Sequence, residues 1–326
     1  MPVLAPTPAN LQAIAATLRA GNLAALPTET VYGLAADATN PAAVLKIYQA
    51  KGRPRFNPLI IHVPDLATAQ QYGAFNAQAT ALAHTYWPGP LTLVVPYNYQ
   101  PSTTNQIPDL VRAGLPSVAI RVPAHSLMQA VLQQVGRPLA APSANRSGHV
   151  SATHPGHVAA DFGSDFPILN GGPCPLGLES TIIDCTTATP TLLRIGALPR
   201  EAAERVLGQP LALPQGTDPA SPKAPGMLLK HYAPQAPVRL NATHLEPGEA
   251  LLAFGDAQKI LATPNHQPPT KNLSPTADLA EAALNLFAML RELDALHPTA
   301  IAVMPIPPTG LGEAIADRLS RAAAGR

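Results

Sequence analysis

Residues 51–62 read KGRPRFNPLIIH, and residues 141–148 read APSANRSG. In both stretches polar and basic groups adjoin a short apolar run, which indicates a buried strand that begins or ends where those groups gather. The helix before the first stretch is well delimited, because Asn40 suits an N-cap, Pro41 the first turn and Gly52 the C-terminal stop. A helix over 40–51 that leads into a strand over 59–63 predicts an α/β unit.

The same alternation extends in both directions from this unit. Apolar runs typical of strands occur at 23–26, 91–95, 118–122, 138–141, 167–169, 181–184 and 192–195. Helical spacing occurs at 11–18 and again at 199–207. Residues 1–208 are therefore predicted to form a mixed α/β sheet domain.

The composition changes after residue 208. Residues 209–236 contain prolines 210, 214, 219, 222, 225 and 234 and little periodic pattern, which is typical of a semi-rigid linker. Strands at 250–254 and 300–303 then alternate with helices at 278–296 and 312–323. Residues 237–326 are therefore predicted to form a smaller α/β domain.

Charge is distributed unevenly although the net charge is only +1. No Asp or Glu occurs between Asp37 and Asp65, and none occurs in the 51 residues from Leu110 to Ala160, where average usage predicts about three. A local positive potential without a large net charge favours a small polyanion in a cleft over a coat of nucleic acid. A nucleotide is the natural candidate.

Several other classes of protein lack support in the sequence. Two cysteines, Cys174 and Cys185, have neither a second pair nor metal-site spacing, which argues against a disulfide scaffold or zinc cluster and favours two buried thiols. The sequence has no signal peptide and no apolar run long enough to cross a membrane, so a cytoplasmic protein without membrane contact is expected. The usual phosphate-binding loops and the HExxH and GxSxG motifs are also missing.

Phosphate must then be held by side chains. Lys51 and Arg53 offer a point charge and a planar fork, and Ser143 and Asn145 offer hydroxyl and amide contacts. Each motif also has an ordinary interpretation when it stands alone. The KGRP run suits a solvated helix terminus, His62 suits a core histidine, and residues 27–33 and 179–181 suit polar turns beside strands.

Six sequence blocks, taken together in their order along the chain, decide between these alternatives. They are PTETVYGL (27–34), KGRPRFNPL (51–59), WPGPLTLV (87–94), AIRVP (119–123), APSANRSG (141–148) and LESTIID (178–184). Together they resemble the YrdC/Sua-type family of threonylcarbamoyl-AMP synthases. PGMLLKHYAP (225–234) and the residues after it resemble the long, two-domain form of that family. The resemblance implies a twisted, mostly parallel open sheet with a large basic cavity, followed by a smaller Rossmann-like α/β domain.

The reaction implied by the resemblance joins L-threonine, bicarbonate or CO2, and ATP into threonylcarbamoyl-adenylate and pyrophosphate. This is nucleotidyl transfer, and its product serves the N6-threonylcarbamoyl modification of adenosine 37 in tRNA through a downstream threonylcarbamoyl transferase complex. Mg²⁺ is expected as a nucleotide-bound cofactor rather than a protein-held metal, because few carboxylates occur in these motifs.

The family's site residues carry over onto matching positions of this chain. Those implied to bind threonine are Thr30, His62, Arg121, Ala141 and Ser180. Those implied to bind ATP are Lys51, Arg53, Asn57, Ser117, Ser143, Asn145, Ser151 and Arg194, with Lys51 and Arg53 also catalytic through neutralisation of the triphosphate. The Arg121 guanidinium matches a carboxylate bidentately.

The linker carries a separate hypothesis. His231 and Tyr232 lie in an arm long enough to fold back, so it is predicted to cover the cavity as a lid, with Tyr232 against the nucleotide or threonine. An ordinary spacer is the alternative.

Two other functions compete with the synthase. An RNA-binding module of the same fold would bind RNA in a salt-dependent manner and consume no ATP, although the aromatic content of 4% is low for a stacking surface. A carbamoyl-transfer role in hydrogenase maturation would be accompanied by zinc-finger cysteines and an acylphosphatase segment, and the chain has neither.

Overall fold

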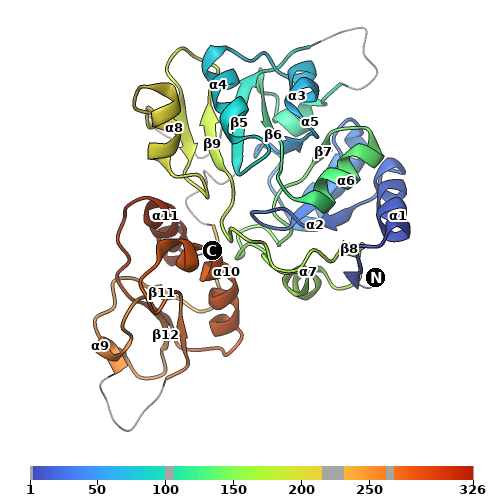
Figure 1. Ribbon diagram of the computed structural model, residues 1–326. Helices are drawn as coiled ribbons and strands as arrows, with labels where there is room; N and C mark the ends of the chain where they lie inside the picture. Colours follow the sequence, from blue (N-terminus) through green and yellow to red (C-terminus); the bar gives the residue numbers. More distant parts are fainter. Residues whose placement is uncertain (1–2, 100–105, 215–230, 262–267, 326) are drawn as a thin grey trace.

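The computed structural model describes residues 3–99, 106–214, 231–261 and 268–325. Two sheets organise these residues, one of ten strands and one of four. The larger sheet and its helices form the upper part of Figure 1, and the smaller unit, in orange and red, lies below it. Among the described residues no helix is both long enough and apolar enough to cross a membrane.

The larger sheet has the strand order β1-β8-β2-β3-β7-β4-β6-β5-β9-β10. Its strands are β1 (Val3–Leu4), β2 (Ala24–Leu26), β3 (Gly33–Asp37), β4 (Ile60–His62), β5 (Leu91–Pro96), β6 (Ser117–Arg121), β7 (Leu139–Ala140), β8 (Ile168–Leu169), β9 (Thr181–Asp184) and β10 (Thr191–Arg194). Parallel pairs such as β4 with β6 and β5 with β9 are interleaved with antiparallel pairs such as β5 with β6. The strands expected from apolar runs are present, whereas β1 and β3 were not expected.

Eight helices are described around this sheet: α1 (Pro8–Arg19), α2 (Pro41–Lys51), α3 (Leu66–Tyr72), α4 (Ala77–Tyr86), α5 (Asp109–Arg112), α6 (Ser126–Val135), α7 (Pro155–Phe162) and α8 (Arg200–Leu207). Helix α2 confirms its sequence signals in detail. The Asn40 side chain accepts hydrogen bonds from the amides of Ala42 and Ala43, and Gly52 ends the helix in the left-handed conformation.

The two faces of the larger sheet are covered differently. One face is apolar along its length, with Leu34, Ala140, Ile61, Ile120 and Ile183 in one core. On the other face, α1 and α6 cover only β2, β3, β7 and β8. Over β4, β6, β5, β9 and β10 that second face carries only a small apolar group, Ile60, Val94, Ala119, Ile182 and Leu193. The fold thus leaves half of one face available for a cavity.

The smaller sheet is parallel throughout, in the order β11-β14-β12-β13. Its elements are β11 (Val238–Arg239), β12 (Ala250–Ala253), α9 (Gln258–Leu261), β13 (Thr270–Asn272), α10 (Leu279–Asp294), β14 (Ile301–Val303) and α11 (Leu311–Ala323). Four parallel strands with helices confirm the expected Rossmann-like α/β unit. Helices α10 and α11 lie on the side that faces the larger unit (Figure 1).

Helix α10 provides much of the contact between the units. The Arg291 guanidinium donates to both oxygens of Asp161 on α7, at 3.1 and 2.7 Å, and to the carbonyls of Val150 and Ser151. Gly177 lies so close to α10 that a Cβ atom there would come within 2.5 Å of the Leu284 backbone. Charged hydrogen bonds and close backbone packing therefore fix the smaller unit against the larger one.

Candidate active site

A single row of side chains crosses the uncovered half of the larger sheet. Strand register places His62 beside Arg121, Arg121 beside Thr92, Thr92 beside Ile182 and Ile182 beside Arg194. Because successive side chains of a strand point to opposite faces, His62, Arg121, Thr92 and Ile182 lie on the same face, and their chain neighbours Ile61, Ile120, Leu93 and Ile183 enter the core behind it. A register irregularity between Leu192 and Arg194 brings Arg194 beside Ile182 as well, and Arg194 lines the cavity on this face. Two guanidinium groups and an imidazole thus share one surface.

Arg121 is held at three points and is 3% exposed. Its Nη1 donates to Thr30 Oγ1 at 2.8 Å and its Nε to the Gly89 carbonyl at 3.2 Å. Its Nη2 lies 2.7 Å from Glu29 Oε1 as an ion pair, but without hydrogen-bond geometry. The guanidinium is fixed in place and still has a polar atom without a hydrogen bond.

His62 is neutral in this setting. Burial, followed by the nearby Arg121 charge, lowers its pKa to about 3. Its Nδ1 is buried and makes no hydrogen bond within the described part of the chain. The imidazole therefore contributes a polar nitrogen to the site and no charge.

Arg194 secures the segment that enters β9. Its Nε and Nη2 donate to the Ser180 carbonyl at 3.0 and 2.9 Å, and Nη2 also lies 3.1 Å from Ser180 Oγ. The same hydroxyl is 2.7 Å from Thr92 Oγ1. Ser180 is thus fixed between two members of the row.

Arg53 enters from the loop after α2. Its Nη2 donates to Asn57 Oδ1 at 2.6 Å and to the Pro58 carbonyl at 2.9 Å. Burial lowers its pKa to about 10, so it remains a cation at neutral pH. Asn57, expected to contact ATP, here orients the Arg53 guanidinium.

Lys51 links two stretches of sequence, residues 51–62 and residues 141–148. Its Nζ donates to the Ser143 carbonyl at 2.6 Å and to the Asn145 carbonyl, and its own carbonyl accepts from the Ser147 amide. Burial, followed by the Arg53 charge, holds the pKa of this ammonium well below its usual value. Lys51 therefore braces the 143–147 loop and is oriented by it.

The described end of the linker also reaches this site. The Ala233 amide donates to the Gly148 carbonyl at 2.9 Å, and the amides of Gln235 and Ala236 donate to the carboxylate of Asp294. Tyr232 has a positive φ of 63° and stacks on Phe287 of α10, with ring centroids 5.6 Å apart. A left-handed conformation is costly for a side chain of this size, which is typical of functional positions.

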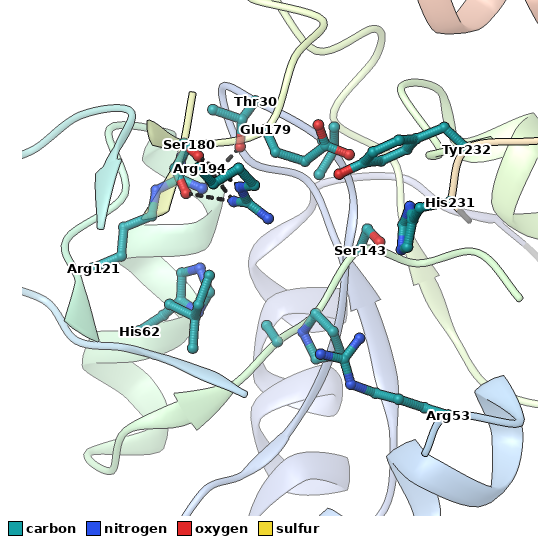
Figure 2. A pocket seen from close by; sticks show the side chains of 14 residues that line it. Thr30, Arg53, His62, Arg121, Ser143, Glu179, Ser180, Arg194, His231 and Tyr232 are labelled. Carbon is teal, nitrogen blue, oxygen red and sulfur yellow. Dashed lines mark hydrogen bonds between the residues drawn. The ribbon is translucent and has the colours of Figure 1, made fainter. Parts of the chain in front are cut away.

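One cavity collects these groups (Figure 2). In Figure 2 Arg53 points into it from below, His62 and Arg121 lie on one side, and His231 and Tyr232 lie on the other. Its lining residues are Thr30, Val31, Arg53, Ile60, His62, Arg121, Ala141, Pro142, Ser143, Glu179, Ser180, Arg194, His231 and Tyr232. All five positions expected to bind threonine are among them.

Five of the expected ATP-binding positions do not line it. Lys51, Asn57 and Asn145 stand directly behind it, and Asn145 donates from its amide to the Arg146 and His149 carbonyls. Ser151 donates to Glu179 Oε1 at 2.5 Å. Ser117 is four residues from Arg121 along β6, a distance of about 13 Å.

Sequence reasoning missed two charged residues here. Glu179 lies within the quoted LESTIID block, but it was interpreted only as part of a polar turn. Arg318 on α11 donates to Glu179 Oε2 at 2.9 Å, and no local pattern connects positions 139 residues apart. Burial raises the pKa of Glu179, but Arg318 and Arg194 lower it more, to about 2. Glu179 is therefore an anion in the cavity wall.

The carboxylates near the cavity are already engaged. Glu179 accepts from Ser151 and Arg318, and Glu29 is paired with Arg121. Among the described residues no group of three or more His, Cys, Asp or Glu side chains has the arrangement of a metal site. A divalent ion here fits as a companion of a bound nucleotide, with phosphate and water as its ligands.

Known proteins resemble the chain over nearly its whole length. The Sua5/YciO/YrdC family model, described as telomere recombination, matches residues 16–196. A second model, described as threonylcarbamoyl-AMP synthase, C-terminal domain, matches residues 198–324. The chain belongs to the Sua5/YrdC family of threonylcarbamoyl-AMP synthases. The expectation drawn from the six sequence blocks is confirmed.

Individual members of the family agree with this placement. The threonylcarbamoyl-AMP synthase of Bacillus subtilis is 39% identical, with 96% of this chain and 92% of that protein covered. The Pyrococcus abyssi synthase is 38% identical, with 94% and 91% covered. These matches favour the synthase over an RNA-binding module.

Solved structures of a two-domain Sua5 share the fold. The crystal structure of P. abyssi Sua5 complexed with L-threonine has a TM-score of 0.86 and 35% identity, and covers 96% of this chain and 94% of its own. A P. abyssi Sua5 variant with an adjacent histidine and tyrosine both changed to alanine has a TM-score of 0.84. At this coverage the similarity spans both the larger and the smaller sheet.

Proposed function

We propose that the protein forms threonylcarbamoyl-adenylate and pyrophosphate from L-threonine, bicarbonate or CO2, and ATP, and that the cavity described above is where it does so. One observation carries the proposal. Arg53, Arg121 and Arg194 face a single cavity whose wall carboxylate, Glu179, is already neutralised by Arg318. Such a cavity suits an amino-acid carboxylate together with a triphosphate.

Threonine is assigned to the end of the cavity formed by the strand row. Arg121 is fixed by Thr30 and the Gly89 carbonyl, and its Nη2, which is ion-paired with Glu29 but makes no hydrogen bond, is assigned to the threonine carboxylate. Thr30, His62 and Ser180 supply polar atoms around it, and Ala141 closes that end. The crystal structure of P. abyssi Sua5 in complex with L-threonine supports a threonine site in this fold.

ATP is assigned to the end formed by Arg53, Ser143 and Arg194. Arg53 is aimed by Asn57, and the 143–147 loop is braced by Lys51, so both are positioned before the nucleotide arrives. Asn145 and Ser151 support this end from behind the wall, and Ser117 remains an expected contact. The catalytic contribution of Lys51 and Arg53 is positioning and neutralisation of phosphate charge.

No side-chain nucleophile is required for the chemistry. The neutral threonine amine and CO2 form a carbamate and release one proton to water. The carbamate oxygen then attacks the α-phosphorus of ATP while the bond from this phosphorus to the oxygen that bridges to the β-phosphate breaks and pyrophosphate leaves. Neutral His62 lies beside this end without adding charge, and the enclosed wall limits hydrolysis of carbamate and mixed anhydride. Bound Mg²⁺ would supply charge neutralisation at the phosphate oxygens.

The linker is assigned the role of a lid. His231 and Tyr232 line the cavity opposite His62 and Arg121, which supports direct contact with substrate. Residues 215–230 of the linker lie outside the described part of the chain. Replacement of His231 and Tyr232 by alanine in the full chain is expected to raise the KM for ATP or threonine, and unchanged kinetics would remove the lid role.

The wider assignments follow from the same reaction. The adenylate would pass to a tRNA threonylcarbamoyl transferase complex, because a mixed anhydride needs a prompt acceptor, and contact with tRNA itself is compatible with the basic cavity. We assign residues 1–208 to catalysis, 209–236 to the linker and lid, and 237–326 to the second domain. A cytoplasmic location completes the proposal.

The direct test supplies the purified full chain with threonine, bicarbonate, Mg²⁺ and ATP. Threonine-dependent pyrophosphate and an adenylate of the expected mass would support the assignment, and their absence would refute it. Arg53→Ala should weaken ATP binding far more than threonine binding. Arg121→Ala should do the reverse, which separates the two ends of the cavity.

A further inference from the structure

Arg318 is the largest fully buried side chain of the described residues, and it belongs to the second domain. It projects from α11 with 1% of its surface exposed. Its Nε donates to Glu179 Oε2 at 2.9 Å and its Nη2 to the Ile195 carbonyl at 2.8 Å. Glu179 and Ile195 belong to the larger unit, so the guanidinium crosses from one unit into the other, while its Nη1 donates to Asp317 Oδ2 on its own helix.

The Glu179 carboxylate is what Arg318 reaches, and it lines the cavity. Its other oxygen accepts from Ser151 Oγ, so each oxygen has one identified donor. Without Arg318 this buried carboxylate would lose its ion-pair partner, would keep only the Ser151 hydrogen bond and the nearby Arg194 charge, and would repel the triphosphate proposed to bind in the cavity. The charges of Glu179 and Arg318 cancel each other, so Arg53, Arg121 and Arg194 leave the cavity positive.

Tyr232 connects the same guanidinium to the linker. The Arg318 guanidinium carbon lies 5.0 Å from the centre of the Tyr232 ring, and the opposite partner of that ring is Phe287 on α10. Cation–π contact of this kind adds to a buried arrangement. One side chain of α11 therefore touches the cavity carboxylate and the linker aromatic at once.

We propose that Arg318 is a positioning residue for ATP use: by neutralising Glu179 and supporting Tyr232, it makes docking of the second domain a condition for the cavity to accept the triphosphate. The inference rests on the proposed function and names what the second domain contributes to it. Arg318 acts through Glu179 and Tyr232, not by contact with substrate.

The decisive experiment removes the charge in two backgrounds of the full chain. Arg318→Met keeps an unbranched apolar stem and leaves Glu179 without its ion-pair partner. The KM for ATP should then rise roughly 10- to 100-fold, because a carboxylate charge a few ångströms from the phosphates would repel them. The KM for threonine should change less than about threefold. In Glu179→Gln/Arg318→Met the KM for ATP should return to within about threefold of Glu179→Gln, because no charge is left to compensate.

A matched control lies one helical turn away. Arg321 on the same helix shares the Asp317 carboxylate with Arg318 and does not line the cavity, so Arg321→Met should leave the KM for ATP unchanged and shows that the Arg318 effect does not pass through Asp317. An unchanged KM for ATP in Arg318→Met, or a defect that Glu179→Gln fails to rescue, would overturn the inference. The second result would assign Arg318 to packing alone.

Two further readouts keep the outcomes separate. Calorimetric titration with Mg-ATP measures nucleotide affinity without turnover. The effect of Arg318 on ATP affinity can therefore be measured even if the unmodified protein does not catalyse the proposed reaction, so the two failures are distinguished. If Arg318→Met does not fold, Arg318→Lys replaces it, because lysine retains the charge at Glu179 but lacks the fork. Near-normal ATP affinity in Arg318→Lys supports the inference, and a defect unrescued by Glu179→Gln contradicts it.

Discussion

Replacement of His62 by glutamine should remove part of the loss of folding stability that the protein undergoes as the pH falls below 6.5. Burial lowers the folded-state pKa of His62 to about 3 from an ordinary value of 6.5. As the pH falls below 6.5 the unfolded chain takes up a proton at this imidazole and the folded chain does not. Folding stability is therefore lost from about pH 6.5 down to pH 3.

The size of the effect follows from that shift. Each unit of pKa difference is worth about 1.4 kcal/mol, so the complete loss by pH 3 is about 5 kcal/mol. Between pH 7 and pH 5 the expected loss is about 2 kcal/mol, because the unfolded imidazole is almost fully protonated at pH 5. Stability at pH 7 and above is unaffected by this linkage.

The measurement is urea unfolding at pH 7 and pH 5, without nucleotide, for the unmodified protein and His62→Gln. Trp87 is the single tryptophan and lies in the larger unit, so its fluorescence follows the unit that contains His62. Burial also lowers the pKa of His157 to about 4 and of His231 to about 3, but both residues are present in the two proteins and their contributions cancel. An equal loss of stability in both proteins would refute the assignment of His62 as a buried neutral imidazole.

Three other substitutions test separate parts of the structure. Asn57→Ala removes the amide that orients Arg53, so the KM for ATP should rise about tenfold, which corresponds to about 1.4 kcal/mol, and an unchanged value would contradict the positioning role. Gly177→Ala should destabilise the protein in urea by about 3 kcal/mol or more, because its Cβ would meet the α10 backbone at 2.5 Å, whereas Gly172→Ala, at the same φ of 71° in open space, should cost only about 1 kcal/mol. Equal costs would argue against the close approach. Arg291→Ala should lower the free energy of unfolding by about 3 kcal/mol and speed amide exchange at 233–236, and normal exchange there would show that the linker end docks independently.

Local signals were sufficient wherever one segment settled its own structure. Asn40, Pro41 and Gly52 delimit a helix through backbone chemistry that needs no distant partner, and the structure confirms it. Helices α3 and α4 were missed, because their periodic signal is short or rich in alanine and their stability comes from packing on the sheet. Helix α6 was also missed, although Met128, Val131, Leu132 and Val135 recur at helical spacing. β3 was missed for a related reason, since its GLAAD sequence has no β-branched residue.

The site residues also differ in whether the sequence could predict them. Arg53, Ser143 and Arg121 could be predicted because they lie in blocks with a family resemblance, and the structure brings them to one cavity. The strand register that sets Arg121 beside Thr92 and His62 depends on pairing between distant segments, which no local pattern specifies. Arg318 depends on docking of a whole second domain. The roles of the individual residues stay predictions until the kinetic tests above are done.

The row from His62 to Arg194 has a consequence for how the enzyme can change. Strands β4, β6 and β10 present His62, Arg121 and Arg194 to the cavity, and the neighbouring residues Ile61, Ile120 and Ile195 enter the core. Substitutions at alternate positions can therefore alter substrate preference while the packing behind them is preserved. An insertion or deletion of a single residue in the same strands would exchange the two sets, so these strands can vary in composition but not in length.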